Sequence, residues 1–181
     1  MKQQLVLIGN GMAGMRTIEE LIKLDEGKHY KINVFGEEPH ANYNRILLSP
    51  VLAGEQQFDD IILNSLQWYS DNNITLHTGS PVSKIDRVKR QVITADGTET
   101  PYDQLIIATG SRPFILPVPG AELEGVLGFR DISDVENMLS IAKTHRQAVV
   151  IGGGLLGLEA ANGLLKQGMD VTVVHLMDSL M

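Results

Sequence analysis

Two glycine-rich turns constrain the fold of this chain more than any other feature. The first covers residues 9–14 (Gly-Asn-Gly-Met-Ala-Gly) and the second covers residues 152–157 (Gly-Gly-Gly-Leu-Leu-Gly); each follows a short apolar run and precedes a helical pattern. In such a strand–turn–helix unit the first glycine allows a tight turn, the second lets the backbone approach a pyrophosphate, and the third lets the helix pack closely on the strand. The helix N-terminus offers unpaired N–H groups to the phosphates. The repetition predicts two nucleotide-binding units.

An acidic composition without cysteine limits the chemistry of the side chains. The 22 acidic residues outnumber the 15 Lys and Arg residues, and the formal net charge is −7. The basic residues are scattered, which argues against a nucleic-acid partner. The absence of cysteine excludes a disulfide, a thiolate nucleophile and an iron–sulfur cluster within these residues. Redox chemistry would therefore belong to a bound cofactor. The residues His29, His40, His77 and His145 show no mutual metal-ligand spacing, so we also expect no metal ligand.

The N-terminal residues and the hydropathy indicate a cytoplasmic protein. The chain enters a strand pattern at once, without the basic and apolar regions of a signal peptide. It also lacks a run of about 18 apolar residues that could span a bilayer. We therefore expect no membrane partner.

The second strand of the first unit ends in acidic residues. The apolar residues 31–35 are followed by Gly36, Glu37 and Glu38, so that the acid falls one place later than in the simplest nucleotide-binding pattern. We favour Glu37 as the ligand of a ribose and regard Glu38 as a solvated neighbour. In the alternative interpretation both carboxylates are simply solvated.

The sequence pattern of residues 44–71 predicts two short helices between strands. The first covers residues 44–52 and is expected to break at Pro50. Arg45 stands at its start, where a guanidinium could clamp a phosphate with two hydrogen bonds; the alternative is an exposed arginine without a specific ligand. The second helix, residues 65–71, carries Trp68, which we expect to pack in the core or at an interface rather than to stack on a cofactor.

An antiparallel insertion interrupts the β–α–β rhythm. Residues 88–94 and 98–102 have strand patterns and flank Asp96-Gly97, which is a strong hairpin signal. Residues 105–107 then form another buried strand that ends in a turn of small residues.

Prolines and glycines concentrate in residues 111–125, where we place a domain boundary. The predicted domains are residues 1–112 and 126–181, with 113–125 as a linker. In the second domain a capping box beginning at Ser133 predicts a helix to about Lys143, and Gly168 ends the helix that follows the second turn. A nucleotide-binding half needs more strands than remain, so we expect a piece of a longer protein.

The motifs resemble a known family. Residues 9–14, 108–110 (Ala-Thr-Gly) and 152–161 occur in the order found in flavoprotein oxidoreductases with two dinucleotide-binding domains. Within this family, residues 42–49 and 173–177 are also similar to stretches of the large subunits of NAD(P)H-dependent assimilatory nitrite reductases. The resemblance implies an α/β fold: a Rossmann-like FAD-binding domain with a small antiparallel meander, followed by a truncated second Rossmann-like NAD(P)-binding domain.

The resemblance also implies the ligands of both nucleotides. FAD would lie against two groups of residues, namely Gly9, Gly11, Met12, Ala13, Gly14, Glu37 and Arg45, and Val82, Ala108, Thr109 and Gly110. NAD(P)H would lie against Gly152, Gly154, Leu155, Leu156, Gly157 and Glu159. Two positions depart from related sequences. Pro50 replaces a lysine that often follows the Leu-Ser pair, and His175 stands where NADH enzymes often carry an acid, which leaves NADH and NADPH both open.

The implied activity is hydride transfer from NAD(P)H to FAD, followed by electron transfer to iron–sulfur and siroheme centres that reduce nitrite to ammonia in later domains. Protein groups need only align the two rings and set the flavin potential, so we expect no catalytic side chain. The alternatives are a rubredoxin or ferredoxin reductase and a nucleotide-binding module without turnover. The implied partners are the nicotinamide nucleotide and downstream redox domains or an iron–sulfur acceptor, and the full-length protein could be a homodimer. The chain by itself is expected to bind FAD weakly and to be inactive.

Overall fold

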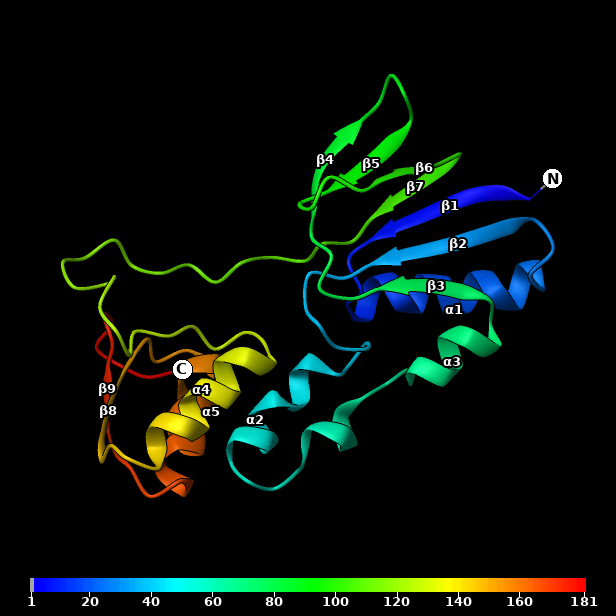
Figure 1. Cartoon of the computed structure of the whole chain (residues 1–181). Helices are drawn as coiled ribbons and strands as arrows, with labels where there is room; N and C mark the ends of the chain where they lie inside the picture. Colours follow the sequence, from blue (N-terminus) through cyan, green and yellow to red (C-terminus); the bar gives the residue numbers. More distant parts are fainter. Residues whose placement is uncertain (1) are drawn as a thin grey trace. The chain divides into compact units, whose positions relative to one another are not determined.

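The computed structural model describes residues 2–181, which form two compact units. Unit 1 comprises the residues up to Tyr43 together with Ile62–Ser111, and unit 2 comprises Asn44–Ile61 together with Arg112–Met181 (Figure 1). Residues 44–61 thus pack with the C-terminal part of the chain rather than with their sequence neighbours. The predicted boundaries 1–112, 113–125 and 126–181 stay a prediction. We call residues 44–61 the exchanged segment, because they belong to unit 2 although unit 1 both precedes and follows them in the chain.

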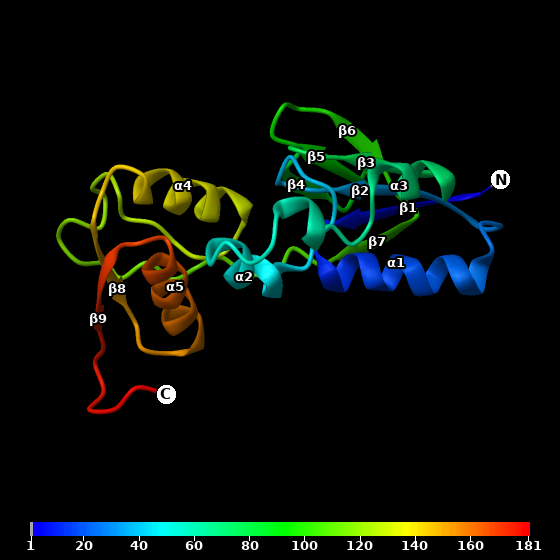
Figure 2. The ribbon, with the colours of Figure 1, turned by 90° about the horizontal axis from the view of Figure 1, so that it is seen from below.

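A four-stranded parallel sheet forms the centre of unit 1, with the strand order β3-β2-β1-β7. Its strands are β1 (Gln3–Ile8), β2 (Tyr30–Phe35), β3 (Ile74–His77) and β7 (Gln104–Ile107). Helices α1 (Met12–Asp25) and α3 (Leu66–Asp71) lie on one face, as Figures 1 and 2 show. Leu5 and Leu7 of β1 pack there with Met15 of α1, and Trp68 packs against the same core, as predicted.

The other face of this sheet is covered by a three-stranded antiparallel sheet. It consists of β4 (Val82–Asp86), β5 (Gln91–Thr94) and β6 (Glu99–Pro101). Val6 and Ile8 of β1 pack against Val92 of β5, so β1 is buried on both faces. The predicted hairpin at Asp96-Gly97 is confirmed. Strand β5 begins three residues later than predicted, because the Asp86 carboxylate accepts hydrogen bonds from the N–H groups of residues 88 and 89 and holds them in a turn.

Unit 2 contains a single β–α–β unit preceded by helices. Its two-stranded parallel sheet pairs β8 with β9 around helix α5, which confirms the predicted second strand–turn–helix. Gly168 lies just after α5 at a φ of +82°, as a helix-ending glycine does. The elements in chain order are the 3-10 helix η1 (Arg45–Leu47), α2 (Leu48–Leu52), the 3-10 helix η2 (Phe58–Ile61), α4 (Ile132–Ala142), β8 (Gln147–Ile151), α5 (Leu155–Lys166) and β9 (Asp170–Val174).

The predicted start of helix α4 at Ser133 is wrong. The N-cap is Asp131, whose side chain accepts the N–H of Asp134 at 2.9 Å, while the Asp134 carboxylate accepts the N–H of Asp131 at 3.4 Å. This is a capping box built from two aspartates. The Ser133 pattern was misleading because the same three-residue spacing also fits the earlier pair.

The predicted helix break at Pro50 is also wrong. Helix α2 runs from Leu48 to Leu52, and Pro50 lies in its first turn. The N–H groups of the first turn have no intrahelical acceptor, so a residue without an N–H is tolerated there.

Helix α2 approaches helix α5 closely at a glycine. A Cβ atom on Gly163 would lie 2.6 Å from Leu52 Cγ and 3.1 Å from Leu52 Cβ. Leu52 is 0% exposed, and its carbonyl oxygen accepts a hydrogen bond from Gln167 Nε2 at 2.8 Å. Lys166 and Glu55 form an ion pair at the end of the same contact. The absence of a side chain at residue 163 therefore lets α2 pack closely against α5.

We expect Gly163→Ala to destabilise the protein by about 1–2 kcal/mol, because overpacking a core contact costs ~1–3 kcal/mol and exceeds the roughly 1 kcal/mol gain in helix propensity. Denaturant unfolding of the full-length protein would measure this. The matched control is Asn162→Ala at the adjacent exposed position of α5, which gains propensity without a clash and should be slightly stabilising. If both variants stabilise the protein, α2 does not approach α5 this closely.

Candidate nucleotide-binding site

The first glycine turn joins β1 to α1, and its three glycines differ in the space that a side chain would find. A Cβ on Gly9, where φ is +109°, would lie 2.2 Å from the carbonyl oxygen of Ala108. A Cβ on Gly14 would lie 2.7 Å from the carbonyl oxygen of Gly9. A Cβ on Gly11 meets nothing within 4 Å. Gly9 and Gly14 are thus required by the packing of the protein, whereas the open space beside Gly11 suits a ligand that approaches the backbone.

The second turn, between β8 and α5, shares most of this geometry. A Cβ on Gly157 would lie 2.0 Å from the carbonyl oxygen of Gly152, and a Cβ on Gly154 meets nothing within 4 Å. A Cβ on Gly152 also meets nothing within 4 Å, but Gly152 has a φ of +119°, which favours glycine as the φ of Gly9 does. In both motifs the first glycine thus has a positive φ, the middle one faces open space, and the third one packs against the carbonyl oxygen of the first.

The helices that follow the two turns have uncapped N-termini. Their N-caps are Gly11 for α1 and Gly154 for α5; neither helix has a side-chain cap or an acidic residue in its first turn. By contrast, α3 is capped by Ser65 and α4 by Asp131. The first N–H groups of α1 and α5, which include those of Met12, Ala13, Leu155 and Leu156, are therefore suited to bind an anion such as a phosphate.

The end of strand β7 lies beside the first turn. The N–H of Ala108 donates to the carbonyl oxygen of Ile8 at 2.8 Å, which brings β7 against the turn. Beyond it, Thr109 and Val82 line a hollow of about 210 Å³ together with Ile8. Gly110 follows with a φ of +73°. The structure thus gathers four of the predicted FAD ligands at one edge of the sheet in unit 1.

The two acidic residues after β2 differ in their surroundings. Strands β1 and β2 are in register at Ile8 and Phe35, so Glu37 and Glu38 follow at the edge that carries the first turn. Glu37 is exposed, whereas Glu38 is half-buried and accepts a hydrogen bond from the Tyr43 hydroxyl at 2.7 Å. Glu38 is thus engaged within the unit, and Glu37 stays the predicted ribose ligand.

A buried polar network that the sequence did not reveal supports the first turn. Asn10, between the first two glycines, accepts a hydrogen bond from the Tyr69 hydroxyl at 2.7 Å and donates to the carbonyl oxygen of His40 at 3.2 Å. Tyr69 is 2% exposed, and burial raises its pKa to about 12, so the phenol keeps its proton for this bond. The same hydroxyl accepts the N–H of Asn42 at 3.4 Å.

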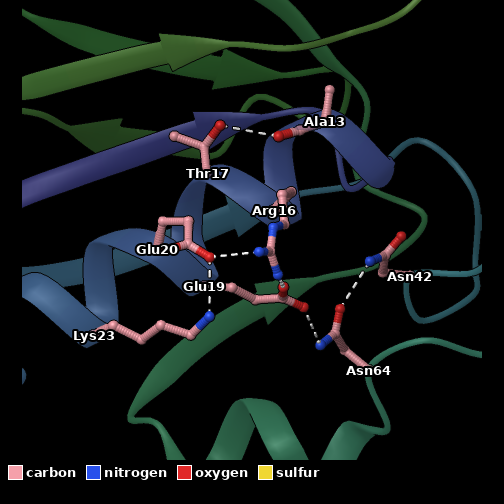
Figure 3. Close-up of polar contacts among 8 residues, drawn as sticks. All are labelled: Ala13, Arg16, Thr17, Glu19, Glu20, Lys23, Asn42 and Asn64. Atoms are coloured by element: carbon pink, nitrogen blue, oxygen red, sulfur yellow. Dashed lines mark hydrogen bonds and ion pairs between the residues drawn. The ribbon is translucent and has the colours of Figure 1, made fainter.

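The network continues from Asn42 to the surface of α1, as Figure 3 shows. Asn42 Nδ2 donates to Asn64 Oδ1 at 2.7 Å, and Asn64 Nδ2 donates to Glu19 Oε1 at 3.0 Å. Glu19 is paired in turn with Arg16 at 3.0 Å. Asn42 and Asn64 flank the point where the chain leaves unit 1 and returns to it, so the network connects the glycine turn to both ends of the exchanged segment.

We expect Tyr69→Phe to lower the free energy of unfolding by about 1–3 kcal/mol, because loss of the hydroxyl leaves the oxygen of the half-buried Asn10 and the N–H of the buried Asn42 without this partner. Denaturant unfolding of the full-length protein is the measurement. Tyr102→Phe is the control; it removes a phenol hydroxyl from a half-buried tyrosine of the same unit that packs on the opposite face of the sheet from Tyr69. Equal stability of both variants would contradict the network.

The remaining predicted ligands lie in unit 2. Arg45 belongs to the exchanged segment, and its Nη1 donates to the carbonyl oxygen of Arg130 at 2.6 Å. Glu159 of α5 accepts a hydrogen bond from Ser49 Oγ at 2.6 Å. From Gly157, a hollow of about 760 Å³ runs along β8 to the apolar residues 113–128. The structure therefore places Arg45 in the unit of the second turn, which its position in the sequence did not indicate.

These features define the class of protein. Two glycine turns, each between a parallel strand and an uncapped helix, are the nucleotide-binding element of Rossmann-type α/β proteins. The chain belongs to the pyridine nucleotide-disulphide oxidoreductase family, whose sequence profile matches residues 3–181. Because the chain contains no cysteine, these residues cannot carry a redox disulfide.

The chain is similar to curated proteins of nitrogen metabolism. It is 56% identical over 180 residues to nitrite reductase [NAD(P)H] of Bacillus subtilis (strain 168), covering 99% of this chain and 22% of that protein. It is also 56% identical over 174 residues to the assimilatory nitrate reductase electron transfer subunit of the same organism, covering 96% and 22%. The chain therefore spans about a fifth of the length of these relatives.

A solved ferredoxin reductase from Rhodopseudomonas palustris has the same fold. The two share 29% identity with a TM-score of 0.87, and the match covers 99% of this chain and 44% of that one. Within residues 2–181, no helix is long and apolar enough to cross a membrane. The same residues contain no group of three or more His, Cys, Asp or Glu side chains placed to hold a metal ion.

Proposed function

We propose that this chain is the nucleotide-binding part of an NAD(P)H-dependent nitrite reductase, in which unit 1 binds FAD and unit 2 binds NAD(P)H. The observation that carries the proposal is the shared geometry of the two turns. In each turn the first glycine has a positive φ, the third glycine is required by packing, and the middle one faces open space. The similarity to nitrite reductase [NAD(P)H] over 99% of the chain supports the assignment of the reaction.

The residues of unit 1 fit FAD. The N–H groups at the start of α1 would hold the pyrophosphate beside Gly11, and Glu37 would accept hydrogen bonds from the ribose. Val82, Ala108, Thr109 and Gly110 form the neighbouring edge, where the hollow beside Ile8 offers room for part of the nucleotide. Arg45 is proposed as a further FAD ligand on the resemblance alone.

The residues of unit 2 fit a nicotinamide nucleotide in the same way. Gly152, Gly154 and Gly157 would admit the pyrophosphate to the N-terminus of α5, where Leu155 and Leu156 supply N–H groups. Glu159 lies one turn further along the helix, with its carboxylate oriented by Ser49. When bound, FAD accepts the hydride of NAD(P)H and releases electrons singly, while the protein groups bind and align the nucleotides.

The reduction of nitrite would take place outside these residues. The chain covers 22% of the nitrite reductase it resembles, and it contains no cysteine that could ligate an iron–sulfur cluster. We therefore propose that iron–sulfur and siroheme centres in other domains of the full-length protein receive the electrons and reduce nitrite to ammonia.

The test is the absorption spectrum of the purified full-length protein during anaerobic turnover. We expect flavin and siroheme bands, bleaching of the flavin by NAD(P)H, reoxidation on addition of nitrite, and formation of ammonia. A flavin spectrum without siroheme would contradict the nitrite assignment and leave the flavoprotein assignment intact. A protein without flavin would contradict both.

A second candidate function is electron delivery to a separate acceptor. The chain is equally similar, at 56% identity, to an assimilatory nitrate reductase electron transfer subunit, and it shares its fold with a ferredoxin reductase. In this case NAD(P)H would bleach the flavin, but nitrite alone would not reoxidise it. Reoxidation would require an added iron–sulfur protein or a nitrate reductase subunit.

A further inference from the structure

The two glycine turns differ in the residue that follows their first glycine. In each turn the N–H of the first glycine donates to the carbonyl oxygen of the last residue of the neighbouring strand, at 2.8 Å from Gly9 and at 2.9 Å from Gly152. This shared register matches Asn10 of the first turn with Gly153 of the second. The first turn therefore has a side chain at a place where the second turn has none.

The strand beside each turn is adapted to this difference. A Cβ on Gly36, the residue after β2, would lie 3.0 Å from Asn10 Cβ, which is closer than Cβ atoms normally approach other atoms. In unit 2 the arrangement is reversed, because the residue after β9 is His175 and a Cβ on Gly153 would lie 2.8 Å from His175 Cγ. The space is thus filled from the turn in unit 1 and from the strand end in unit 2.

Two hydrogen bonds hold the amide of Asn10 in one orientation. The Tyr69 hydroxyl donates to Asn10 Oδ1 at 2.7 Å, and Asn10 Nδ2 donates to the carbonyl oxygen of His40 at 3.2 Å. The Tyr69 hydroxyl also accepts the N–H of Asn42 at 3.4 Å, so its single proton is left for Asn10. A carbonyl oxygen can only accept, so the amide nitrogen must face His40 and the amide oxygen must face Tyr69.

The phenol that holds Asn10 is itself fixed by the core of unit 1. Tyr69 is 2% exposed and belongs to the same hydrophobic cluster as Leu7 of β1 and Met15 of α1. The rotamer freedom of this ring is therefore lost when the protein folds and not when a ligand binds. The backbone of the first turn, and the N–H groups that follow it, are thus ordered in advance by Asn10.

The second turn lacks this restraint. Residues 152–154 are three consecutive glycines, and glycine loses more conformational freedom on ordering than any other residue. Gly153 is held by one hydrogen bond, from its N–H to His175 Nδ1 at 3.0 Å. Ordering a site in advance strengthens binding because less freedom is lost in the complex, and differences in affinity between related complexes lie mostly in their dissociation rates.

We propose that Asn10 and Tyr69 are positioning residues that fix the first turn and slow the dissociation of its nucleotide, whereas the second turn, which lacks such a pair, releases its nucleotide rapidly. The inference rests on the proposed function, in which FAD stays bound at the first turn and the nicotinamide nucleotide leaves the second turn after each hydride transfer. It assigns this difference in residence time to one residue of the turn and its buried partner.

The experiment measures how fast bound FAD exchanges. Flavin-loaded full-length protein is mixed with an excess of isotopically labelled FAD, and the label retained after rapid gel filtration is followed with time. Asn10→Gly gives the first turn the three consecutive glycines of the second, and we expect it to exchange at least ~10-fold faster than the wild type, because two hydrogen bonds are lost and the backbone is freed. Tyr69→Phe keeps the bond to His40 and should exchange about threefold to tenfold faster.

Asn64→Ala is the matched control. It removes the acceptor of Asn42 Nδ2 in the same buried network and lowers the stability, but it leaves every hydrogen bond of Asn10 and Tyr69 in place. We expect its FAD to exchange within about twofold of the wild-type rate. The NAD(P)H concentration that gives half-maximal bleaching of the flavin should stay within about twofold in all three variants, because none of them alters the second turn.

The outcomes distinguish this inference from the proposed function. A wild-type exchange rate in Asn10→Gly, or in Tyr69→Phe if Asn10→Gly does not fold, would overturn the role of the pair. Equal acceleration in Asn64→Ala would also overturn it, since exchange would then follow the stability of the unit alone. A wild-type protein that holds no FAD would overturn the proposed FAD site, and the inference with it.

Discussion

Gly9→Ala will destabilise the full-length protein by about 3 kcal/mol or more and will abolish flavin retention. The new Cβ would lie 2.2 Å from the carbonyl oxygen of Ala108, and the atom it meets is backbone, so strand β7 must move away from β1. In addition, Gly9 has a φ of +109°, a conformation that alanine adopts only with strain of order 1–3 kcal/mol. Thermal unfolding and the flavin content after gel filtration measure the two effects.

Gly11→Ala is the matched control for this experiment. Its Cβ meets nothing within 4 Å, and the φ of Gly11 is −91°, which alanine adopts freely. We expect an unfolding temperature close to that of the wild type together with a dissociation constant for FAD raised roughly 100-fold, because the methyl group occupies the place proposed for the pyrophosphate. Wild-type affinity for FAD in this variant would show that the phosphates bind elsewhere.

Gly157→Ala will remove the response to NAD(P)H while the flavin stays bound. Its Cβ would lie 2.0 Å from the carbonyl oxygen of Gly152, so α5 must shift away from the turn that is proposed to hold the nicotinamide nucleotide. Gly157 belongs to unit 2, whereas the turn that is proposed to bind FAD belongs to unit 1. We expect the affinity for NAD(P)H to fall by about 100-fold or more, measured as the rate of flavin bleaching against nucleotide concentration.

Two comparisons make this result specific. Dithionite should still reduce the flavin of Gly157→Ala at the wild-type rate, because it needs no binding site. Gly154→Ala, whose Cβ meets open space, should also lose affinity for NAD(P)H but keep the stability of the wild type. Saturation of Gly157→Ala at wild-type concentrations of NAD(P)H would be incompatible with the proposed site.

The local sequence pattern was sufficient to predict those elements that depend only on residues close together in the sequence. The strands before the two turns, the helices α1 and α5, the hairpin at Asp96-Gly97 and the stop at Gly168 all follow from apolar spacing and turn chemistry within a few residues. The same local rules failed where two residues fit the spacing of a helix cap equally well. Asp131 and Ser133 both precede a possible partner by three residues, and only the folded chain shows that Asp131 makes the cap.

The partners of the site residues could not be inferred in this way. Tyr69 is 59 residues from Asn10, and Ser49 is 110 residues from Glu159. Nothing in the local sequence of either residue indicates such a partner, because a phenol or a hydroxyl can be exposed as easily as buried. The predicted roles of Glu37, Arg45 and Glu159 accordingly stay predictions, now with known surroundings.

By itself, the sequence determined that this chain holds two Rossmann-type glycine turns and that its redox chemistry must come from bound cofactors, because turn geometry and the lack of cysteine are local properties. Only the tertiary structure decided that Asn44–Ile61 packs with the C-terminal residues and that the imidazole of His175 lies against Gly153. Both depend on contacts between residues far apart in the chain, where a missing side chain at Gly163 or Gly153 makes the space that another residue fills.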